Sequence, residues 1–277
     1  MTHSTTFSVL FFFLVQLKGF SQQAIQVQQN GEGEPILFLP GFANSSEVWT
    51  ETLDHLDGTY QTHLIDYAGF NGLPPIDSPW LPRVNQALVD YIQSKDLKQV
   101  TLVGHSLGGT LALYLAAELK ERVKEIILVD ALPYTAKLMF PNQTEFEYDN
   151  LFSKSMLEMD DSSFETMATQ QVNMMAFNED KRPQILEWIL NTDRKTYVNG
   201  YIDYLNFNAT TFLEQIDCPV LILGVTSYGE AQAKQTYKDQ YQLLKHYDLK
   251  MAPTSAHYIM YDQPEWFYTQ LNLALND

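Results

Sequence analysis

Cysteine, basic residues and long apolar runs are scarce in this sequence. The only cysteine among 277 residues is Cys218, which excludes an intramolecular disulfide and a thiolate-based metal site. The 17 lysines and arginines stand against 34 aspartates and glutamates, so the formal net charge is −17. Such acidity repels phosphate backbones and anionic lipid surfaces. We therefore expect neither nucleic acid nor an anionic membrane as a partner.

One short apolar run lies near the N-terminus, at residues 7–17 (FSVLFFFLVQL). It is too short to span a bilayer. Its length is typical of the apolar core (h-region) of a signal peptide, and Gly19 and Ser21 are small residues at −3 and −1 of a cleavage before Gln22. A buried N-terminal strand or helix is the alternative. We predict that residues 1–21 are a signal peptide, that the protein is exported (periplasmic or secreted), and that no stable membrane anchor remains.

The rest of the chain alternates between strand-like and helix-like patterns. Runs rich in β-branched residues and leucine predict strands, and amphipathic or alanine-rich runs predict helices between them. The expected strands are residues 24–29, 35–39, 60–66, 99–104, 123–129, 218–224 and 247–251. The first two flank NGEGE (residues 30–34), which predicts a hairpin. The alternation as a whole predicts an α/β fold with a mostly parallel sheet and helices on both faces.

Residues 131–211 break this alternation. They contain no strong strand pattern, and helical spacing recurs through them together with five methionines. We predict that this segment is a helical cap inserted into a core formed by residues 22–130 and 212–277. The methionines fit ordinary packing between helices, and they also fit an adaptable apolar wall above a pocket.

The sequence Gly104-His105-Ser106-Leu107-Gly108 matches the pattern G-x-S-x-G. A predicted strand (VTLV) leads into it and a predicted helix (LGGTLALYLAAELK) follows, which is the context that gives the pattern meaning. Glycine permits the close backbone approach of a sharp strand-to-helix turn. The serine would then be exposed at a helix N-terminus, where the helix dipole favours negative charge. We predict that Ser106 is a nucleophile.

A serine nucleophile requires a base and a site for the oxyanion. His257 is the candidate base, because it lies in a predicted loop between a short strand and the last helix. The loop LPGF (residues 39–42) directly follows a predicted strand and can present the Phe42 N–H. The Leu107 N–H, at the start of the helix, is its predicted partner. The alternative interpretation of LPGF is a simple turn.

With these motifs the chain resembles the α/β-hydrolase family of esterases, lipases and related acyl-processing enzymes. The resemblance extends from about residue 30 to the end, and it rests on LPGF, DYAGFNG, GHSLGG and SAHYIMYDQPEWF. It implies an eight-stranded, mostly parallel sheet with a helical cap inserted after the sixth strand, where residues 131–211 lie. It also implies that Ser106 is the nucleophile, that His257 is the general base, and that Phe42 and Leu107 supply the oxyanion N–H groups.

The chain departs from the family pattern at two places. Pro40 stands where a histidine usually precedes Gly41, and the segment 224–227 (GVTS) lacks the acid expected in G-x-x-D. Glu230 is the nearest acid, three residues late, whereas Asp130 follows the preceding strand at the same predicted edge of the sheet. We predict Asp130 as the acid that orients the base, with Glu230 as the alternative. Asp130 could instead only bind a loop at the strand end.

The sequence therefore predicts a serine hydrolase that acts on a small carboxylic ester or related acyl bond through an acyl-enzyme. The aromatic residues of the loops and cap favour an apolar acyl or aryl group; they are Phe70, Trp80, Tyr134, Phe140 and Phe177. No cofactor or metal is expected, because metal-ligand spacing, a dinucleotide fingerprint and a P-loop are absent from the sequence. The alternatives are a catalytically silent binding protein, an acyltransferase or a peptidase. Nothing in the sequence indicates an oligomeric state.

Overall fold

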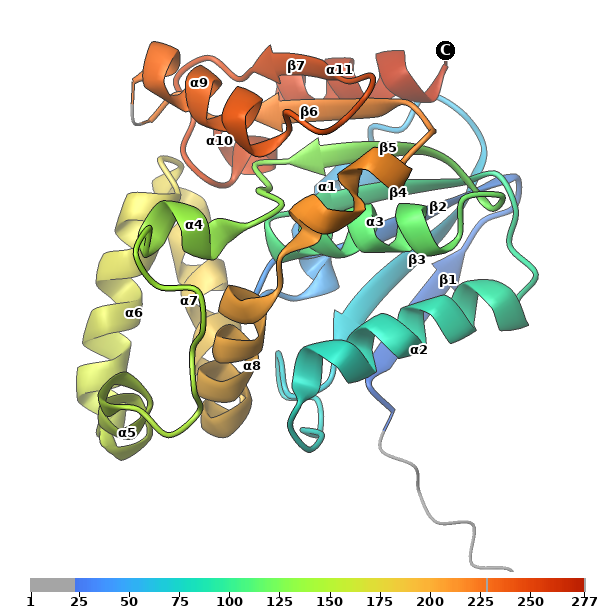
Figure 1. Ribbon diagram of the computed structural model, residues 1–277. Helices are drawn as coiled ribbons and strands as arrows, with labels where there is room; N and C mark the ends of the chain where they lie inside the picture. Colours follow the sequence, from blue (N-terminus) through green and yellow to red (C-terminus); the bar gives the residue numbers. More distant parts are fainter. Residues whose placement is uncertain (1–22, 228, 277) are drawn as a thin grey trace, which may run out of the picture.

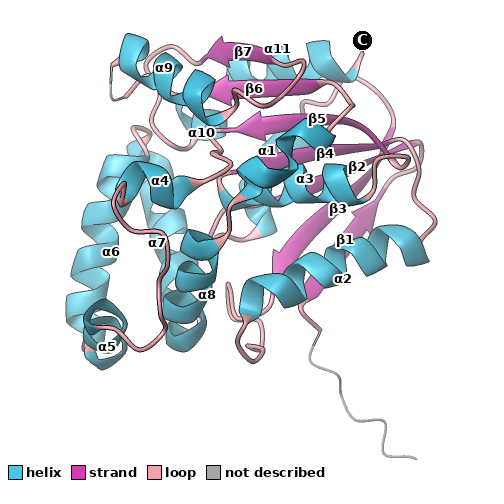
Figure 2. Cartoon of the chain, in the orientation of Figure 1, coloured by secondary structure: helices cyan, strands magenta, loops and turns pink. Residues whose placement is uncertain are grey.

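The structure is a computed structural model that describes residues 23–227 and 229–276. The predicted signal peptide, residues 1–21, lies outside the described residues and stays a prediction. A mixed sheet forms the centre of the described chain, and helices cover both of its faces (Figures 1 and 2). None of the helices in this part of the chain has both the length and the apolar character needed to cross a membrane.

Seven strands form the sheet in the described residues, in the order β1-β3-β2-β4-β5-β6-β7. Their bounds are β1 (Ile25–Asn30), β2 (Glu34–Leu39), β3 (Tyr60–Tyr67), β4 (Val100–His105), β5 (Val123–Val129), β6 (Val220–Gly224) and β7 (Asp248–Met251). Strand β1 is antiparallel to β3, and all other pairs are parallel. The expected count of eight strands is wrong for the part of the chain that the structure describes. Only one described strand precedes β2, so the helical insertion follows the fifth strand and not the sixth.

The predicted hairpin between the first two strands was also wrong. Strand β1 pairs with β3, which lies between β1 and β2. The glycines of NGEGE instead allow the connection to pass close to the start of β3. A Cβ atom on Gly31 would lie 2.4 Å from the carbonyl oxygen of Tyr60, and one on Gly33 would lie 2.3 Å from that of Thr59. Both glycines have positive φ angles, so the pattern marked a close approach of backbones.

Alternating side chains of the parallel strands supply the two faces of the sheet. In β2, Leu37 and Leu39 face one apolar layer, whereas Ile36 and Phe38 face the other. The helices α2 (Trp80–Ser94), α3 (Leu107–Glu118) and α9 (Glu230–Gln240) cover the first face. The second face is covered by the 3-10 helix η1 (Ser46–Trp49) and the helix α11 (Pro264–Leu275), near the short helices α1 (Thr50–Leu53) and α10 (Ile259–Asp262). The inner strands have continuous apolar runs because both faces of the sheet are covered.

Helices alone occupy the chain between β5 and β6. They are α4 (Thr135–Met139), α5 (Leu151–Glu158), α6 (Asp161–Met175), α7 (Arg182–Leu190) and α8 (Arg194–Asn206), with the 3-10 helices η2 (Glu179–Lys181) and η3 (Ala209–Gln215). Figure 1 shows α4 to α8 gathered beyond the edge toward which β4, β5 and β6 point. This edge is where loops carry functional groups in open α/β sheets.

The register of the parallel strands aligns their carboxyl ends. Leu39 pairs with Gly104, and Val129 pairs with both His105 and Leu223. The residues that follow these strands therefore leave the sheet at one level. They are the loop after Leu39, Ser106, Asp130 and the segment after Gly224.

Candidate active site

Ser106 lies in the turn between β4 and α3. Its φ of 53° and ψ of −121° place it outside the regions that serine usually adopts. The turn is stabilised by the Ser106 N–H, which donates to the Val129 carbonyl oxygen at 3.0 Å. Such strain persists only where surrounding structure holds it, and it is common at functional sites. The side chain of Ser106 is partly exposed at the N-terminus of α3.

The glycines around Ser106 are required by close backbone contacts. A Cβ atom on Gly104 would lie 2.5 Å from backbone atoms of Gly108 and Gly109. A Cβ atom on Gly108 would lie 2.1 Å from the Leu39 carbonyl oxygen. The first contact closes the turn on itself, and the second presses the start of α3 against the loop after β2. The steric reading of the glycines in the sequence pattern is therefore confirmed.

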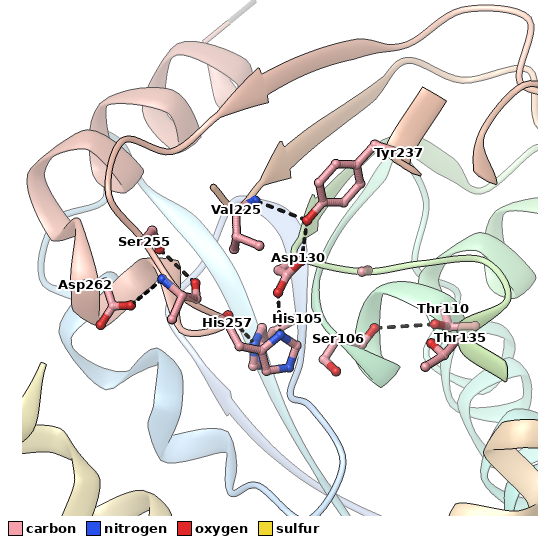
Figure 3. Close-up of polar contacts among 12 residues, drawn as sticks. His105, Ser106, Thr110, Asp130, Thr135, Val225, Tyr237, Ser255, His257 and Asp262 are labelled. Carbon is pink, nitrogen blue, oxygen red and sulfur yellow. Dashed lines mark hydrogen bonds and ion pairs between the residues drawn. The ribbon is translucent and has the colours of Figure 1, made fainter. Parts of the chain in front are cut away.

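His257 and Asp130 meet at the carboxyl edge of the sheet. The Nδ1–H of His257 donates to Asp130 Oδ2 at 2.5 Å. Asp130 has a φ of 40°, and its N–H donates to the Leu223 carbonyl oxygen at 2.8 Å. Figure 3 shows the opposite side of the His257 ring directed toward Ser106. No hydrogen bond between Ser106 and His257 is recorded in the described chain, and such contacts are often long before substrate binds.

Glu230, the alternative acid, is not part of this arrangement. It is the first residue of α9 and is exposed to solvent. The two residues before the position of the missing acid make other contacts. The N–H of Val225 donates to the Tyr237 hydroxyl at 3.1 Å, and the Thr226 hydroxyl donates to the Ala252 carbonyl oxygen at 3.1 Å. The structure thus brings Asp130, and not Glu230, to His257.

Phe42 and Leu107 lie on either side of the contact between the loop and α3. The structure records no hydrogen bond from the N–H of Phe42 or of Leu107 to another described residue. The side chain of Phe42 is packed among aromatic rings at centroid distances of 5.0 to 6.3 Å; these belong to Phe70, Trp80, Tyr197 and Tyr201. Of the expected pocket aromatics, Phe70 and Trp80 are buried, whereas Phe140 and Phe177 are exposed. Tyr197 and Tyr201, both on α8, were not predicted.

Three contacts hold the loop that carries His257. The Nε2–H of His105 donates to the His257 carbonyl oxygen at 3.0 Å, and the Tyr258 hydroxyl donates to Asn44 Oδ1 at 2.9 Å. Asp262 Oδ2 accepts from the Ala256 N–H at 2.8 Å. Complete burial lowers the pKa of His105 well below its usual value, and a charge on His257 lowers it further. His105 is therefore a neutral structural donor.

Two tyrosines near these residues were missed by sequence reasoning. The Tyr237 hydroxyl donates to Asp130 Oδ1. The hydroxyl of Tyr204, on α8, lies 2.7 Å from Thr135 Oγ1. Burial raises the pKa of Tyr204, and hydrogen bonds with Thr110, Thr135 and Ser106 oppose that rise. Neither tyrosine lies in a motif, so no local signal could have indicated its contact.

No group of three or more histidine, cysteine, aspartate or glutamate side chains arranged to hold a metal ion is found within residues 23–227 and 229–276. The chemistry available at this edge of the sheet is that of a strained serine hydroxyl, an imidazole, a carboxylate and two backbone donors. This set is suited to transfer of an acyl group.

Comparison with curated proteins finds esterases. Pimeloyl-(acyl-carrier protein) methyl ester esterase from Nitrosomonas europaea is 23% identical over 178 residues, which cover 64% of this chain and 66% of that protein. The protein of the same name from Legionella pneumophila is 26% identical over 155 residues, or 56% of this chain and 62% of that protein. The chain thus aligns with slightly less than two thirds of the length of these relatives.

Comparison with solved structures finds the same fold. An esterase from Exiguobacterium antarcticum matches with a TM-score of 0.75 at 17% identity, covering 91% of this chain and 96% of that one. A family model described as the alpha/beta hydrolase fold matches residues 34–264. Since this match spans most of the sequence, from β2 to the start of α11, the chain belongs to the alpha/beta hydrolase fold family.

Proposed function

We propose that this protein is a serine hydrolase that cleaves a small carboxylic ester through an acyl-enzyme. Ser106 is the nucleophile, His257 the general base and Asp130 the acid that orients it. The observation that carries the proposal is the 2.5 Å hydrogen bond from His257 Nδ1 to Asp130 Oδ2, made at the edge where Ser106 leaves the sheet. The relatives named above are methyl ester esterases, which supports an ester as the bond that this protein cleaves.

The acylation step begins when Ser106 Oγ attacks the ester carbonyl carbon. Nε2 of His257 takes the hydroxyl proton, and the carbonyl oxygen becomes the oxyanion. Asp130 stabilises the imidazolium and holds its tautomer, because Nδ1–H points at the carboxylate. The imidazolium then protonates the departing alkoxide, so that an alcohol leaves and an acyl-serine remains. Water, deprotonated by His257, attacks the acyl carbon. The imidazolium then returns this proton to Ser106 Oγ as the acyl–oxygen bond breaks, which releases the carboxylic acid and restores the free enzyme.

The oxyanion is assigned to the N–H groups of Phe42 and Leu107. Both donors are free of partners among the described residues, and both adjoin the contact between the β2 loop and α3. Donors that are already oriented stabilise charge without reorganisation during the reaction. The packing of the Phe42 ring among four aromatic rings fixes that donor in place.

The substrate class follows from the charge and the helical insertion. With a net charge of −17, the protein disfavours anionic esters and accepts neutral or cationic ones. Several cations of the helical insertion are engaged in ion pairs; these are Lys154–Asp149, Lys181–Glu51, Arg182–Glu179 and Arg194–Asp161. We propose that α4 to α8 act as a cap, with Tyr197 and Tyr201 contributing an apolar wall beside Phe42. A small, uncharged, apolar ester fits this environment.

The direct test is hydrolysis of p-nitrophenyl esters of graded acyl length by protein lacking residues 1–21, compared with Ser106→Ala. We expect turnover that is lost in the variant, with an optimum at a short or medium chain. A fluorophosphonate probe should label the protein and fail to label Ser106→Ala. If folded protein shows neither turnover nor labelling, a catalytically silent binding protein replaces this proposal. Labelling together with transfer to an added alcohol or amine in place of water would indicate an acyltransferase or a peptidase.

We also propose that the protein is exported through the apolar segment at residues 7–17. The support is the pattern of that segment and of the small residues after it. Cell fractionation of the full chain and of a chain without residues 1–21 tests this. Export of the full chain alone, with a mature N-terminus at Gln22, is expected. Retention of both forms in the cytoplasm would contradict it.

A further inference from the structure

The carboxylate of Asp130 has two partners, one on each oxygen. His257 donates to Oδ2, and the hydroxyl of Tyr237, from α9, donates to Oδ1 (Figure 3). The Tyr237 oxygen also accepts the N–H of Val225 at 3.1 Å. Because Val225 N–H is a donor only, the single hydroxyl proton of Tyr237 is left for Asp130.

Tyr237 is fixed in this position by packing. Its side chain is 3% exposed. Its ring lies against the end of β6, where a Cβ atom on Gly224 would be 2.5 Å from Tyr237 Cε2. Burial raises the pKa of Tyr237 well above its usual value, and the nearby charge of Asp130 raises it further. The hydroxyl therefore stays protonated, and so a donor, across the working pH range.

We propose that Tyr237 is the positioning residue of the site, which holds the Asp130 carboxylate so that Oδ2 faces His257. This inference rests on the proposed function, because it gives Asp130 its role as the acid of the triad. Without the Tyr237 hydroxyl, Oδ1 loses its partner and the carboxylate is free to rotate about its Cβ–Cγ bond. A hydrogen bond to a charged group is among the stronger ones in proteins, so its loss has a measurable effect.

This arrangement lies where the chain departs from the family pattern, at residues 224–227. The end of β6 carries no acid, and its Val225 N–H is paired with the tyrosine hydroxyl. The residue directly after α9 contacts the segment after Asp130, since the Tyr241 hydroxyl donates to the Ala131 carbonyl oxygen at 2.8 Å. Of these two tyrosines, only Tyr237 donates to the Asp130 carboxylate. An acid after β5 is thus supported by a helix that follows β6.

Tyr237→Phe tests the proposal, with Tyr241→Phe as a matched control. Both variants remove one hydroxyl from a buried ring, Tyr237 within α9 and Tyr241 directly after its last residue, and Tm is measured for each. We expect Tyr237→Phe to lower kcat about tenfold with KM unchanged. We expect Tyr241→Phe to keep kcat within about twofold. Rates are normalised to the folded fraction measured by circular dichroism and, separately, to the amount of enzyme labelled once the fluorophosphonate reaction is complete. Equal kcat in the two variants would overturn the proposal.

A double-mutant cycle with Asp130→Asn shows whether Tyr237 acts through the carboxylate. If it does, Tyr237→Phe has little further effect on kcat in the Asp130→Asn protein. The same tenfold loss in both backgrounds would overturn the assignment. The Ser106→Ala control separates the positioning role of Tyr237 from the proposed serine hydrolase activity. If the wild-type protein hydrolyses esters, Ser106→Ala does not, and Tyr237→Phe matches wild type, the positioning role fails and the proposed function stands. If wild-type protein shows no serine-dependent turnover, both fail.

Discussion

The Nδ1 atom of His257 lies 2.5 Å from Asp130 Oδ2, although 127 residues separate the two in the sequence. Strand pairing and the loop after β7 bring Asp130, Ser106 and His257 to one edge of the sheet. The pairing of β4 with β5 places Asp130 beside Ser106, and the loop after β7 delivers His257 to the same edge. The left-handed backbone of Asp130, with a φ of 40°, turns the chain at the end of β5. This short contact is the basis for assigning the acid.

Asp130→Asn is expected to reduce kcat by roughly 10⁴-fold, because the amide no longer stabilises the imidazolium and selects the wrong tautomer. The fold should persist, since the two side chains have almost the same shape. Steady-state hydrolysis of a p-nitrophenyl ester, with thermal unfolding alongside, provides the measurement.

Glu230→Gln is the control for that experiment. Glu230 is exposed at the start of α9, so kcat should change by less than about twofold. If Glu230→Gln lost activity and Asp130→Asn did not, the carboxylate would be wrongly assigned.

Gly108→Ala is expected to lower Tm by roughly 5 °C or more, because the new Cβ must displace backbone. That atom would lie 2.1 Å from the Leu39 carbonyl oxygen. Gly200→Ala, inside α8, is the control. Its Cβ would lie 3.4 Å from Trp80 Cε3, which is ordinary contact, and alanine favours a helix. Calorimetry should show Tm unchanged or higher for Gly200→Ala, and a tolerated Gly108→Ala would refute the steric argument.

Asp262→Ala should weaken both the His257 loop and its attachment to the helical insertion. The Asp262 carboxylate accepts from the N–H groups of Phe177 and Asn178, each at 2.9 Å, and of Ala256 at 2.8 Å. Loss of an acceptor shared by three donors costs about 2–3 kcal/mol, or roughly 5–10 °C in Tm. A lower kcat should accompany this change, because Ala256 precedes His257.

Asp239→Ala provides the comparison for Asp262→Ala. Asp239 is an exposed residue of α9 whose carboxylate accepts only from the Gln235 side chain in the described residues. Its removal should shift Tm by about 1 °C at most. Similar decreases in Tm in the two variants would show that the hydrogen bonds of Asp262 add no more stability than those of an exposed carboxylate.

Low pH should destabilise the protein, because His63 is buried in its neutral form. Burial lowers the pKa of His63 to about 4 from 6.5, and the charge of Lys95 acts in the same direction. The unfolded chain therefore takes up the proton first, so this stability is present above pH 6.5 and is lost as the pH falls toward 4.

Urea unfolding at two pH values checks the sign of this effect. The midpoint for wild-type protein should fall between pH 7 and pH 5, and His63→Gln should show a smaller fall because glutamine does not titrate. The variant starts lower at pH 7, since it loses the contact of His63 Nδ1 with the Tyr91 hydroxyl at 2.7 Å. An identical fall in both proteins would exclude His63 as the cause.

Features that depend on neighbouring residues could be predicted from the sequence. The turn at Ser106 was predictable because close backbone contacts admit only glycine at Gly104 and Gly108, a demand expressed within five residues. The parallel strands were predictable because strands that are buried on both faces have continuous apolar runs. The helical insertion was predictable because residues 131–211 lack such runs and show helical spacing. Sequence order also placed Ser106 and Asp130 directly after consecutive predicted strands.

The tertiary structure decided the choice of partners. The edge strand β1 pairs with β3 because the connection at Gly31 and Gly33 passes over the start of β3, which no turn pattern distinguishes from a hairpin. His257 meets Asp130 and not Glu230, and Tyr237 completes the carboxylate's contacts. These contacts depend on the register of strands and on helix packing across more than 100 residues. Local sequence sets the conformation of a segment, whereas the free energy of packing the whole core selects which distant groups meet.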